Sequence, residues 1–182
     1  MRAALDAAGE AHRRTSPNPR VGAVVVADGR IVGYGATQPP GGAHAERVAL
    51  SEAGPAAAGA TLYTTLEPCD HEGRTAPCTD AIIGADVARV VVGVEDPDPE
   101  VSGRGLGRLR EAGLVVDVGV LVDEVTNTLA PYLHHRRTGR PYVVLKLAAT
   151  VDGRIAAPDG TSRWITGTEA RLDVHRLRAS CD

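Results

Sequence analysis

Apolar positions along the first 135 residues switch repeatedly between the 3.6-residue spacing of helices and the compact β-branched runs of strands. Asp28-Gly29 separates the first two β-branched runs, which is typical of a hairpin. The alternation predicts an α/β fold, a three-layer α/β/α sandwich with helices on both faces of a sheet. The predicted elements are helices over 3–12, 43–53, 77–83, 106–112 and 123–135, and strands over 21–26, from 31, 60–66, 87–94 and 114–118.

A polar segment containing Gly139 and Pro141 follows the last of these helices and predicts a linker over 136–141. We place the domain boundary within it, so that one domain covers 1–138 and a second unit covers 139–182. The second unit is predicted to hold a strand over 142–149 and a helix over 169–179. Its roughly 40 residues are too few to bury an independent core, so we expect it to be incomplete.

Composition narrows the classes of function. Hydrophobic residues make up 43% and charged residues 24%, as in globular proteins. The aromatic share of 3% and the net charge of −3 disfavour nucleic acid as a partner. No apolar run approaches the roughly 18 residues of a membrane span, and Asp6 interrupts any signal-peptide pattern. We therefore expect a cytoplasmic protein without a membrane partner.

Three short motifs carry candidate chemistry: His44-Ala45-Glu46 and Pro77-Cys78 at predicted helix starts, and Pro68-Cys69 after a predicted strand. One imidazole and two thiolates are the three protein ligands of a catalytic zinc, which keeps a water in its fourth position. A carboxylate two residues after the histidine can move the proton of that water to a leaving amine. This is the general pattern of zinc-dependent deaminases, although their usual Cys-x-x-Cys is here replaced by eight intervening residues.

Taken singly, each of these residues has a plainer explanation. A histidine at a helix start is often a cap or a solvated residue, and cysteines in an apolar chain are often buried hydrophobes. Their joint placement in alternating α/β order favours the metal site. Cys181 has no comparable partner, and we expect it to be structural.

Several segments together resemble the bifunctional deaminase/reductase family of riboflavin biosynthesis, and the resemblance extends through essentially the whole chain. The long Cys-x8-Cys spacing is the form found in that family. The segments are PNPRVGAV (17–24), GAHAE (42–46), TLEPCDHEGRTAPC (65–78), Asp96-Pro97, GRG (103–105), RTGRPY (137–142), DGR (152–154) and WIT (164–166).

The resemblance implies a cytidine-deaminase-like fold followed by the truncated start of a dihydrofolate-reductase-like domain. It implies zinc-dependent removal of the amine at C2 of a phosphorylated ribosylaminopyrimidine, a small-molecule substrate. Zinc is implied on His44, Cys69 and Cys78, with Glu46 as the proton shuttle. The implied substrate contacts are Asn18, His71, Arg74 and Asp96, for which turns, caps or a solvated loop arginine are the plainer explanations.

Two positions depart from the family pattern. Ala36-Thr37 stands where the family often has a histidine, and Asp98 replaces a common asparagine, which places an extra carboxylate near a phosphorylated substrate. Both departures concern substrate affinity.

The second unit matches only the first part of the family's NADPH-dependent reductase. Ala148, Ser162, Trp164 and Arg178 match its nucleotide or substrate positions. NADPH is implied only for a complete reductase domain, so we expect this chain to deaminate without reducing. Family members commonly associate as homo-oligomers, although the sequence itself leaves the oligomeric state open.

Two other functions remain open from the residues alone. One is another zinc deaminase, acting on guanine, cytidine or tRNA adenosine. The other is a non-catalytic binding module stabilised by zinc, in which His71 would complete a four-ligand site.

Overall fold

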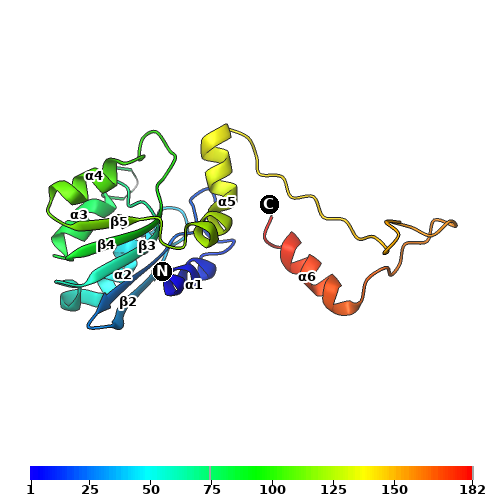
Figure 1. The fold of residues 1–182 in the computed structure, drawn as a ribbon, viewed down its shortest axis with the longest axis horizontal. Coiled ribbons are helices and arrows are strands. Elements are labelled where there is room, and N and C mark those ends of the chain that lie inside the picture. Colours follow the sequence, from blue (N-terminus) through cyan, green and yellow to red (C-terminus); the bar gives the residue numbers. More distant parts are fainter. Residues whose placement is uncertain (74, 182) are drawn as a thin grey trace. The chain divides into compact units, whose positions relative to one another are not determined.

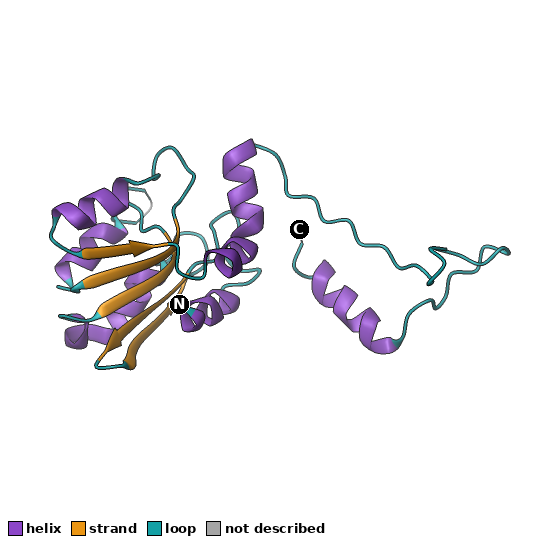
Figure 2. Cartoon of the chain, viewed as in Figure 1, coloured by secondary structure: helices purple, strands orange, loops and turns teal. Residues whose placement is uncertain are grey.

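The computed structural model describes residues 1–73 and 75–181, which form two compact units, Met1–Tyr142 and Val143–Asp182 (Figure 1). The first unit carries a five-stranded sheet in the order β2-β1-β3-β4-β5. β1 runs antiparallel to both of its neighbours, whereas β3, β4 and β5 are parallel (Figure 2). The strands are β1 (Gly22–Ala27), β2 (Arg30–Ala36), β3 (Thr61–Leu66), β4 (Arg89–Val94) and β5 (Val115–Val118).

Helices cover both faces of this sheet: those that connect the parallel strands lie on one face, and others cover the opposite face. One layer contains three helices that contact one another in series, α2, α3 and α4; α1 and α5 pack on the sheet from the other side (Figure 1). The predicted three-layer sandwich is therefore confirmed. The helices are α1 (Arg2–Glu10), α2 (Ala45–Ala53), α3 (Cys78–Gly84), α4 (Arg104–Glu111) and α5 (Val122–Thr138), with a short 3₁₀ turn η1 (Gly54–Ala57) after α2.

The core is aliphatic, and α2 approaches the sheet unusually closely. A Cβ atom on Gly35 would overlap the backbone carbonyl of Ala45, and one on Gly33 would overlap that of Ala49. The face of α2 that packs against these glycines is also made of small residues: Ala45, Ala49 and Ala53, all of which are buried. Close backbone contact fixes the position of α2, and with it the residues at the start of that helix.

The last helix of the first unit is longer than the prediction over 123–135. α5 continues through Arg136 and Arg137 to Thr138 and ends at Gly139, whose φ of 66° is the left-handed conformation of a helix C-terminus. Basic residues in the last turn are favoured by the negative end of the helix dipole. The boundary between residues 138 and 139 stays a prediction.

In the second unit, the described residues 143–181 form one helix, α6 (Thr168–Arg178), close to the prediction over 169–179. The predicted strand over 142–149 was wrong, because these residues form neither helix nor strand. The apolar run over 142–149 predicts a preference for extended backbone, but a strand also needs a neighbouring strand to satisfy its backbone groups, and the described residues provide none there. The start of a dihydrofolate-reductase-like domain therefore stays a prediction. Among the described residues, no helix is long and apolar enough to cross a membrane.

The close approach of α2 to β2 gives a stability prediction. Gly35→Ala should lower the free energy of unfolding by roughly 1–3 kcal/mol, because the new methyl group meets backbone that cannot move aside. Gly107→Ala, in α4 with open space around its Cβ, should instead be neutral or stabilise by up to about 1 kcal/mol. Urea unfolding of both variants measures the difference, and equal midpoints would contradict the close packing.

Candidate metal centre and substrate cavity

The three predicted metal-ligand residues come together at the end of β3. His44 is the N-cap of α2, Cys78 is the first residue of α3, and Cys69 lies in the loop that follows β3. The His44 Nδ1 atom lies 3.3 Å from Cys78 Sγ and 3.6 Å from Cys69 Sγ. The three ligand atoms all lie within 4.8 Å of one another. Two helix N-termini with positive dipole ends therefore meet at a pair of sulfurs.

The chemistry of this donor set fits a zinc ion. Hydrogen bonding from Cys78 and from His44 lowers the pKa of Cys69 to about 4 despite its burial. The hydrogen bond to Cys69, together with burial, raises the pKa of Cys78. The two sulfurs therefore differ in pKa, lowered for Cys69 and raised for Cys78. Nitrogen and sulfur donors of this kind are those that Zn²⁺ prefers, and both cysteines are free thiols.

Glu46 lies beside this centre in the first turn of α2. Its side chain is buried, with 4% of the residue exposed, and its Oε2 atom accepts a hydrogen bond of 3.6 Å from Cys78 Sγ. Burial, reinforced by the negative charge of Cys69, raises the pKa of Glu46 to about 7. The carboxyl group can therefore hold a proton next to the metal position.

A cavity of about 410 Å³ opens onto the centre, a volume typical of small-molecule sites. His44, Glu46 and Cys69 line it from the centre. Three of the predicted substrate contacts, Asn18, His71 and Asp96, also line this cavity, and the fourth, Arg74, lies outside the described residues. Within the described residues, His71 is not part of the three-residue ligand group, so nothing in the geometry supports a four-ligand site.

Asp96 forms a buried polar wall of the cavity, with 4% of the residue exposed. Its Oδ2 atom accepts a hydrogen bond of 2.8 Å from the Tyr132 hydroxyl, and its Oδ1 atom accepts one of 2.9 Å from the Asp98 N–H. Burial raises the pKa of Asp96. Both oxygens are therefore held in place by the protein at the cavity surface.

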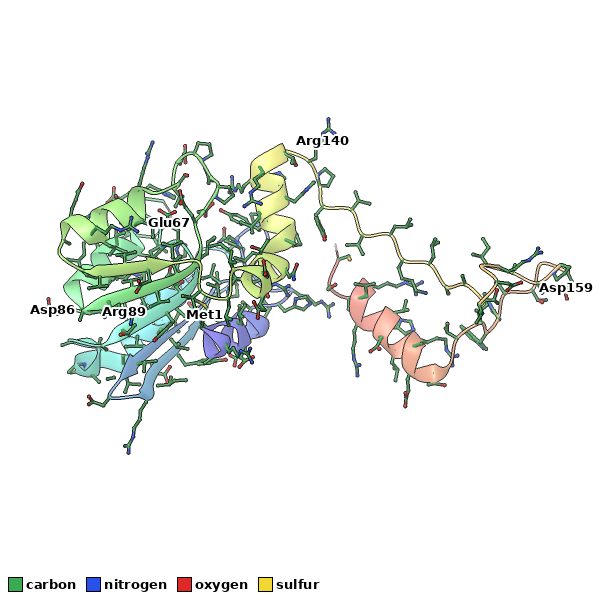
Figure 3. The ribbon with its side chains drawn as sticks, in the orientation of Figure 1. Met1, Glu67, Asp86, Arg89, Arg140 and Asp159 are labelled. Carbon is green, nitrogen blue, oxygen red and sulfur yellow. The ribbon has the colours of Figure 1, made fainter. Side chains whose placement is uncertain are left out.

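Sequence reasoning missed Glu67, the residue that organises this end of the sheet (Figure 3). It is 3% exposed, and its carboxylate accepts four backbone N–H groups at 3.1–3.3 Å. The donors are the N–H groups of Asp96, Gly103, Gly105 and Leu106, the last two in the first turn of α4. One feature of the sequence indicated this role, a charged residue between a buried strand and Pro68. The residues that donate to Glu67 could not be predicted, because they lie far along the chain.

Tyr132 and Arg136 of α5 were also missed. Both line the cavity, and the Arg136 guanidinium lies 5.4 Å from the centre of the Tyr132 ring. Arg136 also forms an ion pair of 3.1 Å with Asp98. The carboxylate by which this chain departs from the family pattern is therefore paired with a guanidinium.

The other departure, Thr37, lies at the cavity wall and is tied to the start of the sheet. Its hydroxyl accepts a hydrogen bond of 3.1 Å from the Val21 N–H and donates one of 3.3 Å to the Val21 carbonyl. Thr37 thus supplies a fixed uncharged surface where the family often has a titratable imidazole.

The residues matched to reductase positions lie in the second unit. Ala148 is half-buried, Ser162 and Arg178 are exposed, and Trp164 is 71% exposed with the Arg171 guanidinium 4.4 Å from the centre of its ring. Cys181, expected to be structural, is an exposed free thiol.

The geometry predicts one zinc ion per chain. His44→Ala and Cys78→Ala should each reduce the bound zinc to a small fraction, because each removes one of three donors. Cys181→Ala, which removes an exposed cysteine outside the ligand group, should keep the wild-type content. Elemental analysis of protein purified without chelators measures the ratio, with circular dichroism to verify folding. Full zinc content in folded Cys78→Ala would refute the ligand set.

Comparisons with known proteins agree with this geometry. A family model described as the cytidine and deoxycytidylate deaminase zinc-binding region matches residues 1–94 of the 182. A second model, the RibD C-terminal domain, matches residues 141–182. The first match contains all three ligand residues together with Glu46.

Known relatives extend the likeness to nearly the whole chain. The riboflavin biosynthesis protein RibD of Escherichia coli is 52% identical over 98% of this chain and 49% of its own length. The Thermotoga maritima structure of a diaminohydroxyphosphoribosylaminopyrimidine deaminase/5-amino-6-(5-phosphoribosylamino)uracil reductase has a TM-score of 0.91 at 45% identity, covering 98% of this chain and 51% of that one.

A structure described in a study of A-to-I editing by tRNA:A34 deaminases is 29% identical with a TM-score of 0.54, covering 71% of this chain and 97% of that one. The chain spans about half the length of the curated relatives it matches. Because the zinc-binding region covers more than half of its residues and the ligand geometry agrees, the chain belongs to the cytidine and deoxycytidylate deaminase zinc-binding family, with a cytidine-deaminase-like fold.

Proposed function

We propose that this chain is the deaminase of riboflavin biosynthesis. It would convert 2,5-diamino-6-(5-phosphoribosylamino)pyrimidin-4-one and water into 5-amino-6-(5-phosphoribosylamino)uracil and ammonia, the first of the two activities in the name of the Thermotoga maritima protein. The observation that carries the proposal is the convergence of His44, Cys69, Cys78 and buried Glu46 on one cavity. Similarity to RibD proteins supports the substrate class.

The proposed reaction replaces the amine at C2 of the pyrimidine by oxygen: the C2–O bond forms, the C2–N bond breaks and ammonia leaves. A zinc ion on His44, Cys69 and Cys78 would supply a Lewis acid that lowers the pKa of water to about 7. Glu46 would take the proton of the attacking water on its carboxylate and deliver it to the departing amine. Its burial beside Cys78 keeps that proton out of contact with bulk solvent.

The cavity walls would orient the pyrimidine and its phosphorylated tail. We assign Asn18, His71 and Asp96 to substrate contact, because all three line the cavity. The hydrogen bonds of Asp96 to Tyr132 and Asp98 would hold its oxygens in fixed directions. For Arg74, the proposed contact with the substrate phosphate rests on the resemblance to the family alone.

Other deaminase substrates are less well supported. A tRNA substrate would favour a basic surface and base-stacking aromatics, whereas the chain has a net charge of −3 and 3% aromatic residues. We therefore propose a free small molecule as the substrate. Residues 141–182 match the RibD C-terminal domain. We propose, on the resemblance, that Ala148, Ser162, Trp164 and Arg178 contact nucleotide or substrate where the reductase domain is complete and NADPH binds.

Glu46→Gln tests the proposal directly. The amide keeps the shape and burial of the side chain but cannot carry the proton, so kcat should fall by about 10²–10⁴ while zinc content is retained. The measurement is ammonia release from the diaminopyrimidine phosphate at saturating substrate. Glu52→Gln, on the exposed side of the same helix, retains an acceptor for the Tyr34 N–H and should match wild type. Unchanged kcat in Glu46→Gln would reject the assigned shuttle.

The Asp98–Arg136 pair gives a second prediction. Arg136→Met leaves an unpaired carboxylate at the cavity and should raise KM for the phosphorylated substrate about two- to fivefold, the magnitude of one partly exposed ion pair. Asp98→Asn in the same protein removes the carboxylate and should restore KM toward wild type. Steady-state kinetics of the single and double variants measures the coupling; a KM that stays raised in the double variant would contradict charge compensation.

A further inference from the structure

We propose that Arg108 is a positioning residue for the metal centre: it joins the chain segments that follow the two cysteines and holds them ready for the ion. The proposal rests on the metal centre described above and is independent of the substrate. Arg108 belongs to α4 and lies outside both the ligand group and the cavity lining.

The guanidinium of Arg108 bridges both cysteine segments. Its Nη1 atom donates a hydrogen bond of 2.6 Å to Oδ1 of Asp70, the residue after Cys69, and one of 3.3 Å to Oγ1 of Thr79, the residue after Cys78. Its Nη2 atom donates to Asp80 at 2.5 Å. One planar cation thus contacts side chains adjacent to both sulfur ligands, a geometry that lysine cannot reproduce.

The two segments are also joined to each other where Arg108 contacts them. The Thr79 hydroxyl, in a fully buried residue, donates to Asp70 Oδ1 at 2.5 Å, and the Thr79 N–H donates to the Cys69 carbonyl at 3.3 Å. The Cys78 N–H donates to Cys69 Sγ at 3.5 Å. These contacts close the base of the eight-residue loop that separates the cysteines, so the sulfur separation is set by the fold.

α4 contacts the segment around Cys69 at two further points. Glu67 accepts N–H groups from the first turn of this helix, and a Cβ atom on Gly105 would overlap the Pro68 carbonyl. Gly105 and Arg108 are three residues apart and therefore share a helix face. The residues immediately before and after Cys69 are thus both held against the same face of α4.

The partners of Arg108 differ in how much they should contribute. Its pair with Asp80 is exposed on both sides, with side chains 40% and 49% exposed, so solvent weakens it. Asp70 is 21% exposed and is additionally fixed by Thr79. The contact between Arg108 and Asp70 should therefore contribute most to holding the two cysteine segments in position. Loss of groups that orient metal ligands typically weakens metal binding about 10- to 100-fold.

The test compares zinc affinities of full-length variants by competition between the protein and a chromophoric chelator, with Zn²⁺ as the probe. Arg108→Met, which keeps an aliphatic stem but removes the guanidinium, should bind zinc about 10- to 100-fold more weakly than wild type. Arg110→Met, at an exposed position of the same helix, is the matched control and should bind as wild type does. Asp70→Ala should weaken binding as Arg108→Met does, and the double variant should be no weaker than the weaker single variant.

Urea unfolding of the zinc-free proteins separates positioning from general stability. If Arg108→Met lowers the unfolding midpoint but binds zinc as wild type does, Arg108 is only structural and the proposal is overturned. If Arg108→Met does not fold, Asp70→Ala carries the same test, and wild-type affinity in that variant overturns the proposal. Failure of the wild-type protein to bind zinc would overturn the metal centre itself, and this proposal with it.

Discussion

The close packing of two sulfurs, those of Cys69 and Cys78, is the constraint on which the rest of this structure depends. Hydrogen bonds lower the pKa of the half-buried Cys69, whereas contact with Cys69 and burial raise the pKa of the fully buried Cys78. The fold directs the N-termini of α2 and α3 toward this place, and His44 adds an imidazole nitrogen. Glu46 lies buried beside the same sulfurs, within hydrogen-bonding distance of Cys78, and burial together with the charge of Cys69 raises its pKa to about 7.

Small residues allow this convergence by bringing helix and sheet backbones together. Glycines of β2 face alanines of α2, and Gly105 of α4 lies against the Pro68 carbonyl. Such contacts leave little room for a helix to slide, so the first residue of each helix is located within narrow limits. A site assembled from residues at helix starts and loop ends gains rigidity from this packing without a large aromatic core, which the composition could not supply.

Local patterns made much of the fold and the centre of the site predictable. Apolar spacing predicted the helices and strands of the first unit to within a few residues, because each pattern lies within its own element. The His-x-Glu and Pro-Cys motifs were recognisable because one imidazole, two thiolates and a nearby carboxylate are the residue types of a catalytic zinc site. Glu67, Tyr132 and Arg136 escaped prediction because each acts through a partner about 30 residues or more away, which periodicity does not encode. The prediction of a strand over 142–149 was wrong for a related reason. The apolar pattern of one segment does not show whether a second strand is available to pair with it, and these residues are not part of the sheet.

The charge of the cavity wall cannot be predicted from one residue at a time, because an acidic residue there is paired with a basic one. Asp98 by itself adds a negative group where a phosphorylated substrate is proposed to bind, yet α5 extends one turn beyond its predicted end over Arg136 and supplies the compensating cation. The same turn holds Arg136 over the ring of Tyr132, whose hydroxyl fixes Asp96. The two acidic groups of this wall are therefore both anchored by α5, one by an ion pair and one by a hydrogen bond. A change at either aspartate must be evaluated with its partner on the helix, since that helix determines both the charge and the direction of the oxygens that the cavity presents.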